Sequence, residues 1–456
     1  MMMLSEIAAA LNASINGVDV NITSVGTDSR AIVNQQLFVA IKGERFDGNN
    51  FATEAIKLGA AAALISDEHS DATPAILVKD TRIALGTLAQ YWRNQFTLPV
   101  VAVTGSNGKT TVKEMIASIL HLAKGNVLAT RGNLNNDIGV PLTLLNLRAE
   151  HRCAVIEMGM NHLNEIRYLS HLARPQVAVV NNAGTAHIGE LGSREAIAQA
   201  KGEIFEGLAS DGTAIINADD DFVAYWFSLN QGRKIITFGV DKSADVTAEY
   251  TSLDSHTNIR LKTPEGTIAF DLNALGKHNV LNALAASAVA VALGVPNQLI
   301  AQGLVAFHAV QGRLFFYTGY QQATVIDDTY NANPDSMKAA IDVLVSQGNT
   351  HAKKLIFVMG DMAELGHESS AMHIEIGEYA KAKRLSCLLS FGEMSQQASA
   401  VFGRGGKHFT SLDALVAAIK ADMQVDTCVL VKGSRSMRME RIVNAIVGNK
   451  NIEGAH

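Results

Sequence analysis

The stretch "TGSNGKTT", residues 104–111, contains the residue types that bind the phosphates of a nucleotide. It follows the apolar segment 100–103 and precedes "TTVKEMIASILHLA", in which apolar residues recur with the period of a helix. Backbone N–H groups and the helix dipole favour an anion at such a helix start. Lys109 can reach the β- and γ-phosphates, and the Thr110 hydroxyl can ligate Mg²⁺. The stretch therefore predicts a nucleotide site made of Gly105, Ser106, Asn107, Gly108, Lys109, Thr110 and Thr111.

This loop is shorter than the common phosphate-binding loop. The pattern G-x-x-x-x-G-K-[ST] would place its first glycine at Val103, whereas the first glycine here is Gly105. The alternative interpretation is a glycine turn that caps an ordinary helix. That alternative explains the glycines but gives no reason for a lysine at residue 109, so the nucleotide site is favoured.

Two further polar residues follow apolar strands. Glu157 closes "CAVIE", and His187 lies in a polar loop after "VAVVNN". Ligands bind at the carboxyl ends of strands in open α/β sheets, so Thr110, Glu157 and His187 are candidate Mg²⁺ ligands. A lone Glu is usually solvated and a lone His is often structural. Together, downstream of a phosphate-binding loop, the two residues favour a site.

The elements that must position these residues alternate between apolar strands and helices. This alternation predicts an α/β fold with a mostly parallel sheet and helices on both faces. We expect three domains: 1–82, a small α/β domain; 83–312, a central domain resembling the P-loop ATPases; and 313–456, a Rossmann-like α/β domain. Strands are expected at "QQLFVAI", "AAALIS", "VVAVT", "CAVIEMG", "QVAVVNNAG", "GTAIINADD", "KIITFGV", "KLIFVMGD", "LSCLLSFG" and "TCVLVKGS".

Composition limits the class of partner and compartment. The 456 residues include 38 basic and 44 acidic side chains, a net charge of −6, which argues weakly against nucleic acid or an anionic membrane as the main partner. The apolar run 281–295 is shorter than the roughly 18 to 20 residues of a membrane span, so membrane insertion is not expected. Three widely spaced cysteines without a CxxC pattern indicate buried thiols in a reducing compartment. We therefore expect a cytoplasmic protein. A monomer is also expected, although nothing in the composition decides the oligomeric state.

Further segments, in order along the chain, resemble one family. "TGSNGKTT" is similar to the ATP loop of the Mur ligases, which folylpolyglutamate synthases share, and the resemblance covers essentially the whole chain. It implies a ligase of class EC 6.3.2 in peptidoglycan synthesis that uses ATP to turn a carboxylate into an acyl phosphate, which an amine then attacks. The segments are "GNLNNDIGVPLTLL", "EMGMNHLNEI", "NAGTAHIGELGS", "AKGEIF", "GKHNVLNALAA", "DDTYNANPDSM", "VMGDMAELG" and "KGSRSMRMERI".

The resemblance also implies roles in catalysis and in metal binding. Two Mg²⁺ ions would neutralise the charge of ATP and the carboxylate. Lys201 would carry CO₂ as a carbamate and serve as an anionic metal ligand beside Thr110, Glu157 and His187. From the residues alone, Lys201 is an ordinary lysine on the surface of a helix that Ser193 caps. Lys109, Lys201, His187 and Arg313 are the expected catalytic residues.

Contacts to the adenosine and the phosphates are expected from four more positions. Asn279 and Asn282, three residues apart, share a helix face and suit adenine edges, although Asn at a helix start is also a common cap. By resemblance, Arg313 helps to hold the transferring phosphate and Asp328 contacts the nucleotide. Composition alone indicates only surface charges at Arg313 and Asp328.

"DDTYNANPDSM" with "VMGDMAELG" is similar to the family member that adds a preformed dipeptide. This resemblance implies UDP-N-acetylmuramoyl-tripeptide and D-alanyl-D-alanine as substrates. "TDSR" resembles the family's turn for the uridine nucleotide, although a plain Asp-Ser turn is also possible. The expected substrate-binding residues are Ser29, Arg30, Asn133, Asn135, Asn136, Asn331, Asp335, Lys432 and Ser434.

Two alternatives remain open at this point. One is a related ligase that adds an amino acid to a muramoyl-peptide, or glutamate to folate; the DNPR-type motif that favours the amino-acid-adding relative is absent from the sequence. The other is a nucleotide-driven motor or transporter subunit. That class normally has a full phosphate-binding loop and a strand ending in a Walker-B Asp, and neither fits well here.

Overall fold

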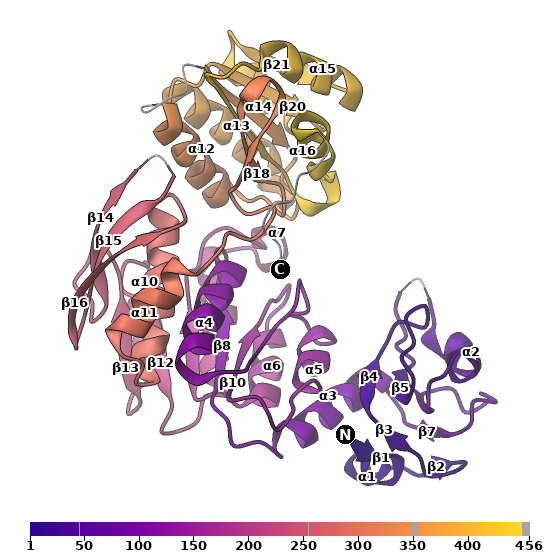
Figure 1. Cartoon of the computed structure of the whole chain (residues 1–456). Coiled ribbons are helices and arrows are strands. Elements are labelled where there is room, and N and C mark those ends of the chain that lie inside the picture. The colour runs from indigo at the N-terminus through magenta and orange to yellow at the C-terminus, as the bar shows by residue number, and fades with distance from the viewer. Residues whose placement is uncertain (45, 254, 349–353, 449–456) are drawn as a thin grey trace.

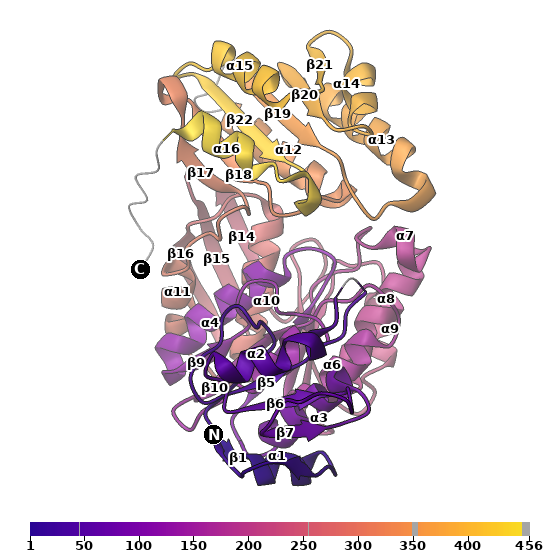
Figure 2. The same ribbon diagram turned by 90° about the vertical axis from the view of Figure 1, so that its right-hand side faces the viewer.

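The computed structural model describes residues 1–44, 46–253, 255–348 and 354–448. It has three domains, and the central one lies between the other two (Figure 1). Figure 2, turned by 90°, shows the C-terminal domain above the central domain and the N-terminal domain against the central domain. The predicted three-domain α/β fold is therefore confirmed. The predicted boundaries stay a prediction; the first of them, at residue 82, falls inside the helix that begins at Thr81.

The N-terminal domain has a five-stranded sheet of order β2-β7-β6-β5-β4 and a two-stranded sheet of β1 and β3. Strands β4 to β7 pair in parallel, and β2 is antiparallel to β7. The elements are β1 (Met2–Met3), α1 (Leu4–Ala10), β2 (Ile15–Asn16), β3 (Asn21–Ile22), β4 (Ser24–Gly26), β5 (Gln36–Val39), η1 (Gly48–Phe51), α2 (Ala52–Lys57), β6 (Ala62–Ile65) and β7 (Ala75–Leu77).

The central domain is built on a six-stranded, fully parallel sheet of order β13-β12-β11-β8-β10-β9. Helix α3 connects it to the N-terminal domain. Its elements are α3 (Thr81–Arg93), β8 (Val100–Thr104), α4 (Lys109–Lys124), β9 (Val127–Ala129), α5 (Gly139–Leu144), β10 (Cys153–Glu157), α6 (Glu165–Ala173), β11 (Val177–Val180), α7 (Ile188–Leu191), α8 (Arg194–Gly202), η2 (Glu203–Phe205), β12 (Thr213–Asn217), α9 (Val223–Ser228), β13 (Lys234–Phe238), α10 (Lys277–Ala292) and α11 (Asn297–Val305).

Both faces of the central sheet are covered, as the apolar strands predict. Along β8, Val101 and Val103 pack in a core with residues of α4 and α10, while Val100 and Ala102 pack in a core with residues of α3 and α6. Successive side chains of a strand point to opposite faces, so a strand buried on both faces reads as a continuous apolar run. Strand β8 pairs in parallel with both β10 and β11, so the carboxyl ends of the three strands lie beside one another.

A three-stranded antiparallel sheet, β14-β15-β16, packs on the α10 side of the central domain. It was not predicted. Its strands are β14 (Thr247–Ser252), β15 (Thr257–Thr263) and β16 (Gly266–Leu272).

The C-terminal domain has a six-stranded sheet of order β17-β18-β22-β19-β20-β21, parallel except for β17. One face of the sheet packs with α12 and α13, and the other with α15 and α16. The elements are β17 (Phe315–Thr318), η3 (Tyr320–Gln322), β18 (Thr324–Asp328), α12 (Pro334–Gly348), β19 (Lys354–Gly360), η4 (Gly366–Glu368), α13 (Ser369–Ala382), β20 (Cys387–Phe391), α14 (Gln396–Phe402), β21 (Gly406–Phe409), α15 (Leu412–Asp422), β22 (Thr427–Lys432), η5 (Arg435–Met437) and α16 (Glu440–Val447).

Among the described residues, none of the helices combines the length and the apolar character that a membrane crossing requires.

Candidate functional site

A cavity of about 1110 Å³ lies where the carboxyl ends of the central strands face the C-terminal domain and the end of α3. All three domains contribute to its wall. Most of the predicted site residues line it: Ser106, Asn107, Gly108, Lys109, Thr111, Asn133, Asn135, Asn136, Glu157, His187, Asn279, Asn282, Arg313, Asp328, Asn331, Asp335 and Lys432. Gly105, Thr110, Lys201, Ser29, Arg30 and Ser434 are not part of the lining.

The turn of the nucleotide loop requires glycine at residue 108. Gly108 has φ +80° and is the N-cap of α4. A Cβ atom there would lie 2.3 Å from Asn282 Oδ1 and 2.7 Å from Asn181 Nδ2. The backbone thus takes a left-handed conformation and packs closely on two amide side chains, so any larger residue would displace the loop.

Lys109 folds back over this loop. Its Nζ donates a hydrogen bond to the Gly105 carbonyl oxygen at 2.7 Å. Burial lowers the pKa of Lys109, and Arg313 lowers it further, while Glu157 and Glu364 raise it. The lysine therefore lies among the cationic and anionic groups that a phosphate-transfer site needs.

Arg313 ties the C-terminal domain to the nucleotide loop. Its Nη2 donates to Thr110 Oγ1 at 2.8 Å, and its guanidinium carbon lies 4.1 Å from the centre of the Tyr330 ring. Its Nε is buried without a hydrogen-bond partner among the described residues. A guanidinium that is held in place and still has a free donor is suited to hold an oxyanion.

Glu157 offers a free carboxylate oxygen beside Lys109. Its Oε1 accepts from Asn135 Nδ2 at 2.8 Å, and its backbone N–H donates to Thr130 Oγ1. Its Oε2 is buried and has no hydrogen-bond partner among the described residues. A buried, unpaired carboxylate oxygen is costly unless a cation binds it, so the residues present fit a metal ion here.

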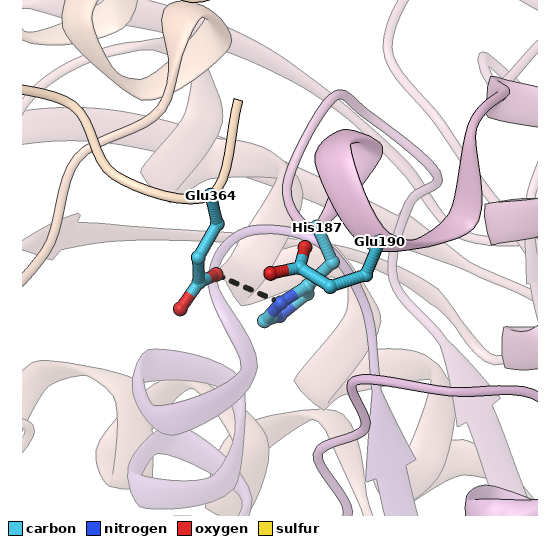
Figure 3. A group of neighbouring side chains, drawn as sticks. All are labelled: His187, Glu190 and Glu364. Carbon is cyan, nitrogen blue, oxygen red and sulfur yellow. Dashed lines mark ion pairs between the residues drawn. The ribbon is translucent and has the colours of Figure 1, made fainter. Parts of the chain in front are cut away.

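His187 faces the C-terminal domain. Its Nδ1 lies 2.9 Å from Glu364 Oε2, and Glu190 lies beside the pair (Figure 3). The contact with His187 lowers the pKa of Glu364. Ligand atoms of the three residues lie within 4.8 Å of one another, close enough to hold a metal ion. Glu364, in "GDMAELG", was not among the predicted site residues, although the resemblance singled out that segment.

Lys201 is not the surface lysine that its helix suggests. Ser193 caps α8 as predicted, accepting from the Ala196 N–H, but the Lys201 side chain is only 1% exposed. Burial, and secondarily Lys109, lower the pKa of Lys201 well below its usual value. Its Nζ has no hydrogen-bond or carboxylate partner in the described part of the chain. Burial without a counter-ion therefore disfavours the charged ammonium form of Lys201.

The two asparagines of α10 share a buried face, as their spacing predicts. Asn282 Nδ2 donates to Asn279 Oδ1, and Asn279 Nδ2 donates to the Leu275 carbonyl oxygen. Asn282 Oδ1 accepts from Asn181. Neither asparagine caps the helix, because Gly276 is the N-cap.

Asp328 and Lys432 form a buried ion pair at the edge of the cavity. Lys432 Nζ lies 2.6 Å from Asp328 Oδ2 and also donates to the Asn331 carbonyl oxygen. Asp328 Oδ1 accepts from the Leu314 N–H, next to Arg313. Composition suggested a surface charge at Asp328, but the side chain is mostly buried. Its hydrogen bond from the Leu314 N–H helps to position the start of the C-terminal domain.

Other predicted substrate residues are engaged by the protein or lie apart. Asp335 Oδ2 accepts from the backbone N–H and hydroxyl of Thr185. Ser434 Oγ accepts from the Ala363 N–H, so it supports the "GDMAELG" loop. Arg30 is highly exposed and pairs with Asp28, whose pKa that hydrogen bond lowers to about 2.

Sequence reasoning also missed a contact between domains at the nucleotide loop. Asn333 Nδ2 donates to Asn107 Oδ1 at 2.8 Å, and Asn333 Oδ1 caps α12 by accepting from the Ser336 N–H. An Asn before a Pro is a recognisable helix start, but nothing in the sequence indicates its partner across the domain boundary.

Models of three protein-family domains match the chain. They are described as "Mur ligase family, catalytic domain" at residues 21–93, "Mur ligase middle domain" at 103–290, and "Mur ligase, glutamate ligase domain" at 312–435. The chain is 45% identical over 451 residues to UDP-N-acetylmuramoyl-tripeptide–D-alanyl-D-alanine ligase of Escherichia coli, covering 98% of each chain. It is 37% identical to the ligase of the same name from Bacillus subtilis, covering 93% of each.

Solved structures agree with these relatives. A crystal structure of MurF from Acinetobacter baumannii superposes with a TM-score of 0.89 at 38% identity, covering 96% of this chain and 97% of that one. MurF ligase from Thermotoga maritima in complex with ADP superposes with a TM-score of 0.83 at 27% identity, covering 92% and 96%. The fold, the nucleotide loop and these relatives lead to one conclusion: the chain belongs to the Mur ligase family.

Proposed function

We propose that the protein is the ATP-dependent ligase that joins D-alanyl-D-alanine to UDP-N-acetylmuramoyl-tripeptide in peptidoglycan precursor synthesis. The observation that carries the proposal is one cavity that contains the nucleotide loop, the unpaired Glu157 carboxylate and the "NANPD" turn of the C-terminal domain. The E. coli and B. subtilis relatives are named for this activity, and the chain aligns with nearly the whole length of each.

The reaction has two steps. A carboxylate oxygen of the tripeptide attacks the γ-phosphorus of ATP, and ADP leaves with the electron pair of the broken P–O bond. The amine of D-alanyl-D-alanine then attacks the acyl carbon, loses a proton, and phosphate leaves. Lys109 and Arg313 would stabilise the charge on the transferring phosphoryl group, since both lie at the loop.

The residues that would hold Mg²⁺ are Thr110, Glu157 and His187, with the free Glu157 Oε2 as the supporting observation. Bound Mg²⁺ supplies charge neutralisation for the phosphates and the reacting carboxylate. In the present geometry the Thr110 hydroxyl accepts from Arg313, and His187 lies against Glu364. We expect both side chains to exchange these partners when the metal and ATP bind.

We further propose that Lys201 is carbamylated. A neutral amine attacks CO₂ and loses one proton, which gives an N-carboxylate with a single negative charge. The buried Lys201 amine, with its lowered pKa and no carboxylate partner, is suited to this reaction. The product would add an anionic metal ligand close to Lys109.

The remaining roles follow the cavity. Asn279, Asn282 and Asp328 would bind the nucleotide, Asn133, Asn135 and Asn136 the muramoyl-peptide, and Asn331, Asp335 and Lys432 the dipeptide side. Ser29 and Arg30 would bind the uridine nucleotide on the N-terminal domain. We place the activity in the cytoplasm, consistent with three free cysteines, and propose a monomer.

The test is ADP release measured against a panel of acceptors and amines. We expect repeated turnover, and so sustained ADP release, only when UDP-muramoyl-tripeptide and D-alanyl-D-alanine are both present. Preferred addition of a single amino acid to UDP-muramoyl-dipeptide would replace this function by that of a related ligase. ADP release that needs neither substrate would contradict any ligase function.

A further inference from the structure

Arg82 lies where the connector helix α3 reaches the cavity. Asp80 caps this helix, with Oδ1 accepting from the backbone N–H groups of Arg82 and Ile83. The cap fixes the position at which the Arg82 side chain leaves the helix. The side chain lines the cavity together with Glu44 of the N-terminal domain and Asp137.

The fold makes little use of the Arg82 guanidinium. Within the described residues, the Arg82 side chain makes a single ion pair, in which Nη1 lies 3.0 Å from Asp137 Oδ2. A guanidinium has five N–H donors, so most of its donors are not used by this ion pair. The two side chains are 47% and 32% exposed, and an ion pair this exposed adds little stability. A cation in the first turn of a helix also opposes the helix dipole. Neither the helix nor the ion pair accounts for an arginine here.

Its neighbours place Arg82 on the acceptor side of the cavity. Asp137 directly follows the "GNLNN" loop, and Asn135 of that loop donates to Glu157. Glu157 is adjacent to the nucleotide loop, whereas Glu44 belongs to the domain proposed to hold the uridine nucleotide. The line from Glu157 through Asn135 and Asp137 to Arg82 therefore follows the expected course of the acceptor peptide.

The chemistry of that acceptor provides a ligand. One solved relative, 38% identical with a TM-score of 0.85, is named for UDP-N-acetylmuramoylalanyl-D-glutamyl-2,6-diaminopimelate. Glutamate has two carboxyl groups, and the peptide bond to the next residue uses one of them. Diaminopimelate also has two, of which the ligation uses one. A peptide of this kind keeps carboxylates that do not react.

We infer that the Arg82 guanidinium binds a non-reacting carboxylate of the acceptor peptide, and that Asp137 orients the guanidinium until the peptide arrives. This inference rests on the proposed function. A planar guanidinium matches a carboxylate through two parallel N–H···O bonds, and such a contact selects acidic peptides over neutral ones.

Steady-state kinetics of Arg82→Ala, Arg82→Gln and Asp137→Ala test the inference. Both Arg82 variants should raise KM for UDP-muramoyl-tripeptide roughly tenfold or more, while kcat and KM for ATP change by less than about twofold. Asp137→Ala removes a competing carboxylate, so KM for the acceptor should stay the same or fall. Arg152→Ala, an exposed arginine outside the cavity lining, is the matched control.

Equal increases of KM in the Arg82 and Asp137 variants would mean that the ion pair is only structural, and would overturn the inference. A second measurement uses acceptors in which each non-reacting carboxylate is replaced in turn by an amide. For one of these amide acceptors, KM of the wild-type enzyme should rise by the same factor by which Arg82→Gln raises KM for the unmodified acceptor. The Arg82→Gln enzyme should have the same KM for that amide acceptor and for the unmodified acceptor. An unchanged KM in Arg82→Gln, with normal turnover by wild type, sinks this inference alone; no turnover by wild type sinks the proposed function.

Discussion

At the scale of single residues, Lys109 gives the most direct test of the nucleotide site. Within the described residues, its Nζ donates hydrogen bonds only to the Gly105 and Ser106 carbonyl oxygens of its own loop, so its loss should leave the fold intact. Lys109→Ala should lower the rate of ADP formation by a factor on the order of 10² or more, because a charge that stabilises the transferring phosphate is lost. Lys124→Ala, in the last turn of the same helix, should retain activity. Near-wild-type ADP formation by Lys109→Ala would contradict the nucleotide site.

Lys201 tests the carbamate at the same scale. Lys201→Ala should be nearly inactive, and small carboxylic acids should partly restore activity because they can occupy the space of the lost carbamate. Lys57→Ala, an exposed lysine on α2, should be neither inactive nor rescued. The opposing outcome is an unmodified lysine in crystals grown near neutral pH with CO₂ present, with Nζ directed away from the metal ions.

The residues show how far sequence reasoning reaches. Lys109 and Glu157 could be identified because their places, in a phosphate-binding loop and at a strand end, are visible in local sequence. The burial of Lys201 was not predicted, because a lysine in a helix is usually exposed; in α8 it lies four residues after the buried Ile197 and so shares the buried face of the helix. Asn333 and Glu364 were not predicted either, because their partners Asn107 and His187 belong to another domain.

At the scale of elements, the apolar strands were predictable and the sheet β14-β15-β16 was missed. Strands of the parallel sheets are buried on both faces and read as apolar runs. In β15, buried Thr257, Ile259, Leu261 and Thr263 alternate with exposed polar residues. A strand that covers a helix with one face has no apolar run, so a search for such runs passes over it.

This sheet should stabilise the central domain without serving the chemistry. Ile259 is 1% exposed and packs in the core that includes α10. Ile259→Ala should lower the free energy of unfolding by about 2 to 5 kcal/mol, because it leaves a cavity, while KM for ATP stays unchanged. Denaturant unfolding measures the first quantity. The exposed neighbour Arg260→Ala should change the free energy of unfolding by less than about 0.5 kcal/mol. A large rise in KM for ATP in Ile259→Ala would show that the sheet shapes the site.

At the scale of the whole molecule, the C-terminal domain contacts the rim of the central sheet at several points. Asn333 contacts Asn107 of the nucleotide loop, and Asp335 accepts from Thr185. The Gly189 N–H donates to the Glu364 carbonyl oxygen. These contacts are hydrogen bonds between polar groups, as in an interface that forms and separates during a reaction cycle. We predict that the stretch before Gly312, where φ is +78°, is the hinge between the central and C-terminal domains. Pro99, which the sequence also suggests as a hinge, lies between α3 and β8 inside the central domain, and its carbonyl oxygen accepts from the Ala154 N–H.

We predict that these domains close during catalysis, because water would hydrolyse an exposed acyl phosphate. Solution scattering should therefore show a smaller radius of gyration with an ATP analogue plus UDP-muramoyl-tripeptide than without ligands. Asn333→Ser keeps a capping hydroxyl for α12 but is too short to reach Asn107, so it should reduce this compaction and lower kcat several-fold with an unchanged melting temperature. Asn146→Ser, an exposed asparagine away from the interface, is the control. If the ligands leave the radius of gyration unchanged in wild type, closure is not part of the cycle; if Asn333→Ser compacts and turns over like wild type, the amide pair does not couple the domains.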